Sequence, residues 1–477
     1  MTLNSLYFLP FAAASVLCVF LVGAVFSAAH RKAAPAQRIA LLVISYIFTA
    51  LFDYRFCLIL LAATLVTYFG ALLTQRGAKW AFPASVVLLV AALGFFKYVN
   101  FFLESVEKFF IGGIGTLNII LPVGISFYVF TAIGYLADVK KKKYAAEKNF
   151  VKVALLLAYF PKIISGPIVR GDDFFPRLED YCGIKYKNFQ TGIQKFAVGL
   201  FKKIVLADHL GVFADDFFAS PSAFNTGTAL LAVFSYSLQI YFDFSGYTDM
   251  AIGISEILGI KLCPNFDLPY LAKNPSDFWS RWHISLSSWL RDYIYFPLGG
   301  SRKGSQRTYF NLMAVMLISG LWHGAGYTFI LWGLLHGLYS CAFRIADRFS
   351  GSRLSGSDKA PVKAACILCN FIIVSFFWIF FRASSFSNAL AVIKSCFTAH
   401  GGISQPYTWS FFAAAVLLAA TVAAIAVSRR KKLKKTVSFY PLVDLGTLKG
   451  QVLFICFAAV TIIMGYFGHT AFIYGNF

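Results

Sequence analysis

The stretch that decides the fold is FCLILLAATLVTYFGALL, residues 56–73, which carries no charged side chain. An α-helix rises about 1.5 Å per residue, so roughly 20 apolar residues cross the ~30 Å hydrocarbon core of a bilayer. Comparable apolar runs recur along the chain, at Leu6–Ala29, Ala81–Phe102, Thr228–Phe242, Ala364–Phe381, Trp409–Val427 and Val452–Phe467. We therefore expect an all-α polytopic membrane protein with roughly ten to twelve membrane-embedded helices.

The composition agrees with this class. Hydrophobic residues make up 58% of the 477 positions and charged residues 13%, well below the roughly 25% of charged residues in a soluble domain. The longest polar stretches are Gly166–Asn188 and Phe349–Pro361, and neither is long enough to bury a core of its own. We therefore treat residues 1–477 as one membrane domain.

The net charge of +22 is distributed in clusters. Basic residues gather at Arg31–Arg38, Arg76–Lys79, Lys140–Lys143 and Arg429–Lys435. The loops around Asp53 and Glu104–Gly115 are poor in lysine and arginine, and this alternation follows the positive-inside rule. We expect the first cluster to be cytoplasmic and both chain ends to lie outside. The charge thus indicates topology and attraction to anionic lipid, and it does not favour nucleic-acid binding.

Cysteine usage does not indicate a metal or redox site. The nine cysteines are scattered, and the pair Cys366 and Cys369 lies inside an apolar helix with no second pair. Zinc sites and disulfide frameworks need clusters at closer and repeated spacing. We therefore expect no metal ion.

Most of the polar chemistry is concentrated in NPSDFWSRWHISLSSWLRDYIYFPLGGSRKG, residues 274–304, and in GLWHGAG, residues 320–326. Ionisable residues inside a membrane protein are costly and are usually functional. Helical spacing over Ser276–Phe296 predicts one amphipathic helix, either in the interface plane or dipping into the core. Its polar face, within an arc of about 80°, carries Asp277, Arg281, Ser285, Ser288 and Asp292. Trp282 belongs to the opposite, aromatic face, and Asp277 and Arg281 have the spacing of an i,i+4 ion pair.

Two histidines in this region are candidate catalytic groups. His323 follows the apolar run Tyr309–Trp322, between Gly320 and Gly324, a pair that lets another backbone or a substrate chain approach closely. An imidazole in an apolar setting tends to stay neutral, so it can act as a general base. Glycine-mediated helix packing around a buried histidine is the alternative. His283 lies near the edge of the aromatic face, where a satisfied core histidine is the commoner case.

Two other segments carry polar or helix-breaking residues at membrane depth. FPKIISGPIVR, Phe160–Arg170, has two prolines and a glycine, which predicts a broken or re-entrant element, with a kinked crossing as the alternative. The helical pattern over Thr228–Ile260 carries on one side Gln239, Asp243, Gly246, Asp249, Gly253 and Glu256. We expect these carboxylates to pair with basic residues of neighbouring helices or to line an aqueous cavity, rather than to act directly in catalysis.

Ordered blocks of sequence add a further signal. They are LGFFKYVNFF (93–102), LPVGISFYVFTAIGYLADV (121–139), YFPKIISGPIVR (159–170), GLFKKIVLAD (199–208), YFDFSGYTDMAIG (241–253), DFWSRWHISLSSWLRDYIYFPLGGSR (277–302), GLWHGAGYTFILWGLLHG (320–337) and the final FIYGNF. With these blocks the chain resembles the membrane-bound O-acyltransferase family, specifically its bacterial alginate O-acetyltransferase branch. The resemblance extends nearly end to end and is weakest before Leu51 and between Gly351 and Gly450.

The resemblance implies that the catalytic histidine of the family falls on His323 and its second signature position on His283. It implies a ring of helices around a tunnel, in the inner membrane of a bacterium. The acyl group, acetyl in this branch, would come from a cytoplasmic thioester such as acetyl-CoA and leave on the opposite side. There the acceptor is often a partner protein with a serine hydrolase-like domain, which passes the acyl group to an extracellular polysaccharide.

The residue chemistry agrees with acyl transfer. His323 could remove the proton of an acceptor hydroxyl, and His283 could orient the acceptor or hydrogen-bond the thioester carbonyl. The chain has no GxSxG elbow, so we favour direct transfer without a metal or a tightly bound cofactor. To tunnel or structural support we assign Trp322, Trp282, Arg281, Asp277, Asp292, Asp243 and Asp249. Alternatives are D-alanyl-type transfer to teichoic acid, a transporter, and a scaffold subunit of a polymer-modification complex.

Overall fold

The computed structural model describes residues 3–5, 7–30, 33–109, 115–181, 183–351, 359–398, 401–404 and 443–468. These residues form helices, and the one β-bridge among them, between Phe224 and Ile403, extends into no sheet. The predicted all-α class is confirmed. Our predictions for the Trp409–Val427 run, the Arg429–Lys435 cluster and the final FIYGNF fall outside the described residues.

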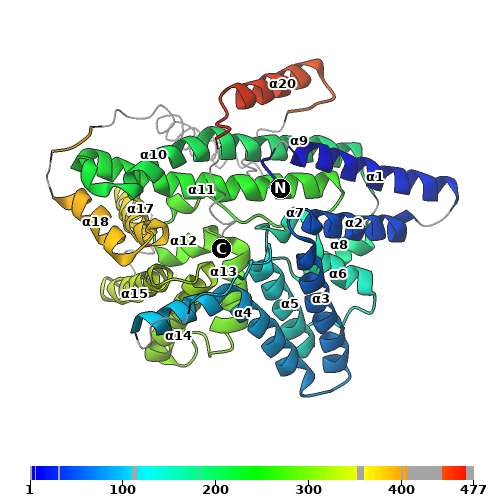
Figure 1. Cartoon of the computed structure of the whole chain (residues 1–477), viewed down its shortest axis with the longest axis horizontal. Coiled ribbons are helices and arrows are strands. Elements are labelled where there is room, and N and C mark those ends of the chain that lie inside the picture. The colour runs from blue at the N-terminus through cyan, green and yellow to red at the C-terminus, as the bar shows by residue number, and fades with distance from the viewer. Residues whose placement is uncertain are drawn as a thin grey trace.

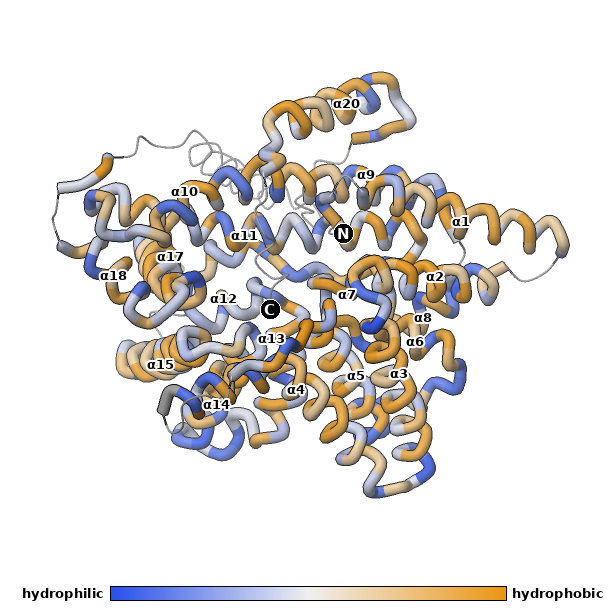
Figure 2. The backbone as a smooth tube through the Cα atoms, in the orientation of Figure 1, coloured by the Kyte–Doolittle hydropathy of each residue, from blue (hydrophilic) through white to orange (hydrophobic). Residues whose placement is uncertain are grey.

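Within these ranges, six helices are long and apolar enough to cross a membrane: α1 (Phe8–Ala28), α2 (Ala33–Ala50), α3 (Tyr54–Gln75), α4 (Ala81–Phe109), α15 (Tyr327–Phe349) and α17 (Ala360–Arg382). Apolar residues dominate these helices, whereas hydrophilic residues gather at turns and helix ends (Figure 2). The multi-pass character is thereby confirmed. The predicted count of ten to twelve stays a prediction, because it includes the Trp409–Val427 run.

The other described helices of eight or more residues are α5 (Ile125–Lys140), α6 (Phe150–Ala158), α8 (Gly171–Glu179), α9 (Tyr186–Phe201), α10 (Asp208–Ala219), α11 (Thr226–Ile257), α14 (Gly304–His323), α18 (Phe386–Phe397) and α20 (Leu448–Ile463). Three shorter helices lie in the middle of the molecule, between α9–α11 along the top, α1–α5 on the right and α14, α15 and α17 on the left (Figure 1). They are α7 (Phe160–Ile163), α12 (Pro275–Arg281) and α13 (Ile284–Leu290). The indole Nε1 of Trp289 donates to the Phe130 carbonyl over 2.8 Å, which ties α13 to α5.

Glycines bring α9 and α11 into backbone contact. A Cβ added at Gly192 would lie 2.5 Å from the Gly253 carbonyl oxygen, and one at Gly199 would lie 2.5 Å from that of Gly246. No real Cβ comes so close to a carbonyl, so any side chain at these positions would force the helices apart. This explains why glycines recur in the polar stripe of α11.

Lysines from the α9 side neutralise the carboxylates of α11. The ion pairs of α11 are Lys195–Glu256 at 2.5 Å, Lys202–Asp249 at 2.6 Å and Lys203–Asp243 at 2.6 Å. Lys203 also pairs with Asp208 of α10 at 2.7 Å. Lys202 and Lys203 are the first two residues of a π-helical turn, η1 (Lys202–Ala207), which follows α9 directly. The expected pairing of these carboxylates with basic neighbours is confirmed, and Asp243 and Asp249 connect α11 to η1.

The segment Phe160–Arg170 is broken, as predicted. α6 ends at Ala158, the next residue is non-helical, and α7 is a single turn with Pro161 near its start. The extended backbone that follows is buried, and the Ile168 amide donates to the Ser285 hydroxyl of α13 over 3.0 Å. This segment therefore contacts α13, the helix that begins at the candidate site.

Candidate active site

The predicted single helix over Ser276–Phe296 is wrong, because the chain breaks at Trp282 and His283. Trp282 is extended (φ −101°, ψ 129°), His283 is left-handed (φ 43°, ψ 54°), and α13 starts at the next residue. The first amides of α13 have no preceding helical turn to bind, and they donate to Asn265, a residue distant in the sequence. Its carbonyl accepts from the Ile284 amide at 2.9 Å, and its side-chain oxygen accepts from the Ser285 amide at 3.2 Å.

The helix break sets the position of His283. A non-glycine residue in the left-handed region is uncommon, and such conformations cluster at functional sites. The side chain of His283 is completely buried. A continuous helix would have left this imidazole at the edge of an aromatic face, whereas the break turns it into the protein interior. A final π-helical turn, η4 (Arg291–Tyr295), ends the segment.

His323 is the last residue of α14, and only 1% of it is exposed. The chain continues in extended conformation at Gly324. A Cβ at Gly320 would collide with the Phe329 carbonyl and reach the Gly333 backbone, and one at Gly324 would collide with the Phe329 ring. The predicted close approach of another backbone is confirmed, and α15 provides it.

His283 and His323 lie close together in a buried cluster of packed aromatic rings, which we call the aromatic chamber. Their ring centroids are 6.4 Å apart, and the ring of Trp322 lies 5.7 Å from the first and 4.9 Å from the second. Further rings close the chamber from four elements: Phe127 of α5, Phe244 of α11, Trp332 of α15 and Phe381 of α17. In such an apolar enclosure, hydrogen bonds and charges act more strongly than in water.

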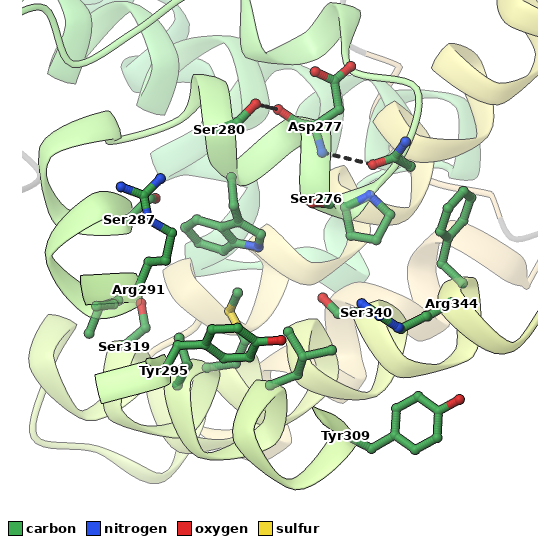
Figure 3. Close-up of a pocket in the computed structure, with 18 of the residues that line it drawn as sticks. Ser276, Asp277, Ser280, Ser287, Arg291, Tyr295, Tyr309, Ser319, Ser340 and Arg344 are labelled. Carbon is green, nitrogen blue, oxygen red and sulfur yellow. Dashed lines mark hydrogen bonds between the residues drawn. The ribbon is translucent and has the colours of Figure 1, made fainter. Parts of the chain in front are cut away.

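A cavity of about 1050 Å³ opens beside this chamber, between α12, α13, α14 and α15 (Figure 3). Three arginines, Arg291, Arg344 and Arg348, line it together with several serines and two aspartates, Asp277 and Asp347. Trp279 and Ser319 also line it. Ser319 precedes His323 by one helical turn on α14, so the cavity extends to within a turn of the histidine.

A comparison with known families decides the identity of the protein. Residues 141–386 match the model of MBOAT, the membrane-bound O-acyltransferase family, and this range contains both histidines. The chain belongs to the membrane-bound O-acyltransferase family. It is therefore an acyltransferase, as predicted.

Curated relatives of this acyltransferase have named activities. A peptidoglycan O-acetyltransferase from Helicobacter pylori is 36% identical over 397 residues, covering 77% of this chain and 75% of the relative. A probable alginate O-acetylase from Pseudomonas putida is 38% identical over 372 residues, covering 76% of this chain and 75% of the relative. A teichoic acid D-alanyltransferase from Bacillus subtilis is 29% identical over 281 residues, covering 54% and 69%.

The charged residues that we assigned to support in this part of the acyltransferase form ion pairs. Arg281 Nε and Asp277 Oδ1 are 2.7 Å apart, which confirms the i,i+4 pair. Asp292 pairs with Arg170 at 2.7 Å and with Arg291 at 2.8 Å. Burial raises the pKa of Asp292, but the two arginines outweigh it, so this pKa lies below its ordinary value. Trp282 is buried against Trp378, with ring centroids 4.9 Å apart.

Two residues of the site were missed from the sequence. His336 of α15 is fully buried, and its ring centroid lies 4.8 Å from that of Trp332 and 5.0 Å from that of Trp279. Neither of its ring nitrogens has a hydrogen-bond partner among the described residues. The dipeptide His-Gly occurs at both 323–324 and 336–337, and this repetition was the available signal. The second missed residue is Lys97, whose ammonium group reaches the carbonyls of Trp322 and His323.

Proposed function

We propose that this acyltransferase moves an acetyl group from a cytoplasmic thioester to a hydroxyl acceptor outside a bacterial inner membrane, for O-acetylation of an extracellular polysaccharide. The observation that carries the proposal is the pairing of His283 and His323 in a buried chamber beside an arginine-lined cavity. The names of two relatives at 36% and 38% identity support acetyl as the group that is transferred.

The charge distribution supports a donor that enters from the cytoplasm. Basic residues at 302, 303 and 307 surround the start of α14, and Arg344 and Arg348 lie near the end of the antiparallel α15. By the positive-inside rule, these helix ends face the cytoplasm. Guanidinium groups bind phosphate in bidentate fashion, so Arg344 and Arg348 suit the phosphates of a donor such as acetyl-CoA. The thioester arm would extend along the cavity towards Ser319.

The chemistry follows from the positions of the two imidazoles. His323 accepts the proton of the acceptor hydroxyl while its oxygen attacks the thioester carbonyl carbon. His283 donates a hydrogen bond to the oxygen that becomes negative in the tetrahedral intermediate. The intermediate collapses with cleavage of the carbon–sulfur bond, and the thiolate leaves and takes the proton from His323. The hydroxyl belongs to a polymer or to a serine hydrolase-like partner that acts outside the membrane.

The test is a histidine replacement in the purified, lipid-reconstituted protein. His323→Ala should lower the rate of thiol release from acetyl-CoA in the presence of acceptor by about 10²-fold or more, because general-base catalysis contributes that much. His209→Ala is the matched control, since His209 lies on α10 and hydrogen-bonds the Met464 carbonyl at 2.9 Å. Folding is compared through thermal unfolding midpoints.

Two further outcomes separate the alternatives. A folded His323→Ala protein that still acylates the polymer at the normal rate would overturn the catalytic assignment and favour a transporter or a scaffold. Transfer from a D-alanyl carrier-protein thioester, with none from acetyl-CoA, would replace acetyl by D-alanyl as the group carried. Acetyl-CoA, longer acyl-CoA donors and the D-alanyl carrier thioester are therefore assayed in parallel.

A further inference from the structure

The end of α14 is closed by side chains of α4. The last four carbonyls of an α-helix have no partner within the helix. In α14 the Gly320 carbonyl accepts from the Gly324 amide, and the Leu321 carbonyl accepts from the Tyr98 hydroxyl. Lys97 Nζ donates to the carbonyls of Trp322 and His323, the latter at 3.4 Å. Two consecutive residues of α4 therefore hold three consecutive carbonyls that end at the candidate base.

Lys97 also places its amino group at this helix end. It is the one charged residue in the apolar run Ala81–Phe102, and ionisable residues at such depth are costly unless they have a role. The C-terminus of a helix carries partial negative charge, which a cation stabilises. Lys97 Nζ also lies 3.5 Å from the Ser126 hydroxyl of α5 and 5.8 Å from the centroid of the Trp322 ring.

The position of the His323 ring depends on where α14 ends. The following residue is an extended glycine, which adds little stiffness of its own. Without a partner for the Trp322 and His323 carbonyls, the last turn could unwind by a residue and move the imidazole. A displacement of about 1 Å at a catalytic group can lower a rate by about 10²-fold.

We propose that Lys97 is a positioning residue of the acyltransferase, which holds the last turn of α14 and thereby sets the His323 imidazole against the thioester carbonyl. The proposal rests on the function proposed for His323. It predicts that the Lys97 amino group matters more than the Tyr98 hydroxyl, because Lys97 binds two carbonyls and Tyr98 binds one. Lys97 touches neither donor nor acceptor in this role, so donor affinity should not depend on it.

The experiment compares four variants of the full-length protein in lipid nanodiscs. Lys97→Met removes the amino group and keeps the length of the side chain, Lys97→Arg keeps N–H donors at this position, and Tyr98→Phe removes a single donor. Lys79→Met is the matched control, because Lys79 is exposed just before α4. The kcat and KM for acetyl-CoA and the thermal unfolding midpoint are measured for each variant.

We expect Lys97→Met to lower kcat by about 10- to 100-fold, in keeping with a misplaced catalytic group, with KM for acetyl-CoA within twofold of the native value. Lys97→Arg should retain most of the native kcat, Tyr98→Phe should lower kcat less than Lys97→Met does, and Lys79→Met should leave it unchanged.

A native kcat in Lys97→Met overturns the inference. The inference is also overturned if Lys97→Met lowers kcat, Lys97→Arg does not restore it, and kcat falls in proportion to the unfolding midpoint across the variants. If His323→Ala is also fully active, the proposed function itself has failed, whereas an inactive His323→Ala beside a fully active Lys97→Met rejects only the role of Lys97.

Discussion

The backbone conformation of His283 limits which residues can replace it without loss of stability, whatever the role of its imidazole. Its φ of 43° lies in the left-handed region, which costs an ordinary residue about 1–2 kcal/mol and which asparagine tolerates. A β-branched side chain there is a severe outlier. The strain is maintained because Asn265 binds the two amides that follow.

We therefore predict that His283→Val unfolds at a lower temperature than His283→Asn, a difference of about 1–2 kcal/mol in unfolding free energy. Both variants lose the imidazole, so activity should fall in both, while stability should fall mainly in the valine variant. Thermal unfolding in detergent, followed by tryptophan fluorescence, measures the difference. Equal midpoints for the two variants would contradict the backbone argument.

Single residues also show how far sequence reasoning could go. His323 and His283 lie in recognisable motifs, and they could be singled out as candidates. Lys97 could not, because a lysine near the end of an apolar run is ordinarily explained by its ammonium group reaching towards the interface. Its carbonyl partner lies 225 residues further along the chain, and only the docking of α4 on α14 brings the two together.

At the scale of elements, the α9–α11 interface is the clearest case of a sequence pattern with a structural reason. The stripe on α11 predicted ion pairs with basic neighbours or an aqueous cavity, and the structure shows the ion pairs. The close approach of the α11 glycines to α9 is a further finding that the sequence did not predict. The identity of the partners, Lys195, Lys202 and Lys203, depends on how α9 docks. The single helix predicted over Ser276–Phe296 was wrong for a similar reason, since periodicity does not report a competing partner such as Asn265.

We predict that Gly246→Ala destabilises the protein by about 1–3 kcal/mol, the usual cost of overpacking. The new Cβ would lie 2.7 Å from the Gly199 carbonyl oxygen and 3.1 Å from the Lys203 amide nitrogen. Gly227→Ala on the same helix is the control, because its nearest neighbour, Asn225 Oδ1, is 3.6 Å away. That variant should be neutral or slightly stabilised, since alanine is the better helix former. Thermal unfolding midpoints of the two variants decide the matter, and similar losses in both would argue against backbone contact.

At the scale of the whole molecule, apolar runs were sufficient to predict a helical membrane protein, but they did not predict its centre. The short helices α7, α12 and α13 have no membrane-length run, and they lie among the long ones because prolines and a left-handed histidine interrupt the chain. The arginine-lined cavity beside them combines residues from α12, α13, η4, α14 and α15. No linear pattern connects Arg291 with Arg344, so the cavity could only emerge from the fold.

The orientation of this cavity leads to a prediction about the whole molecule. In a background with the native cysteines replaced, Arg344→Cys lines the cavity, and Ile120→Cys lies on the exposed loop before α5. From the positive-inside rule, we expect residue 344 to face the cytoplasm and residue 120 the opposite side. A membrane-impermeant maleimide should therefore label Arg344→Cys only in inverted vesicles and Ile120→Cys only in right-side-out vesicles. If the cavity holds the donor, acetyl-CoA should slow labelling at 344 and leave labelling at 120 unchanged. Labelling of residue 344 from the outside would place the cavity on the acceptor side, and the donor would then need another route to His323.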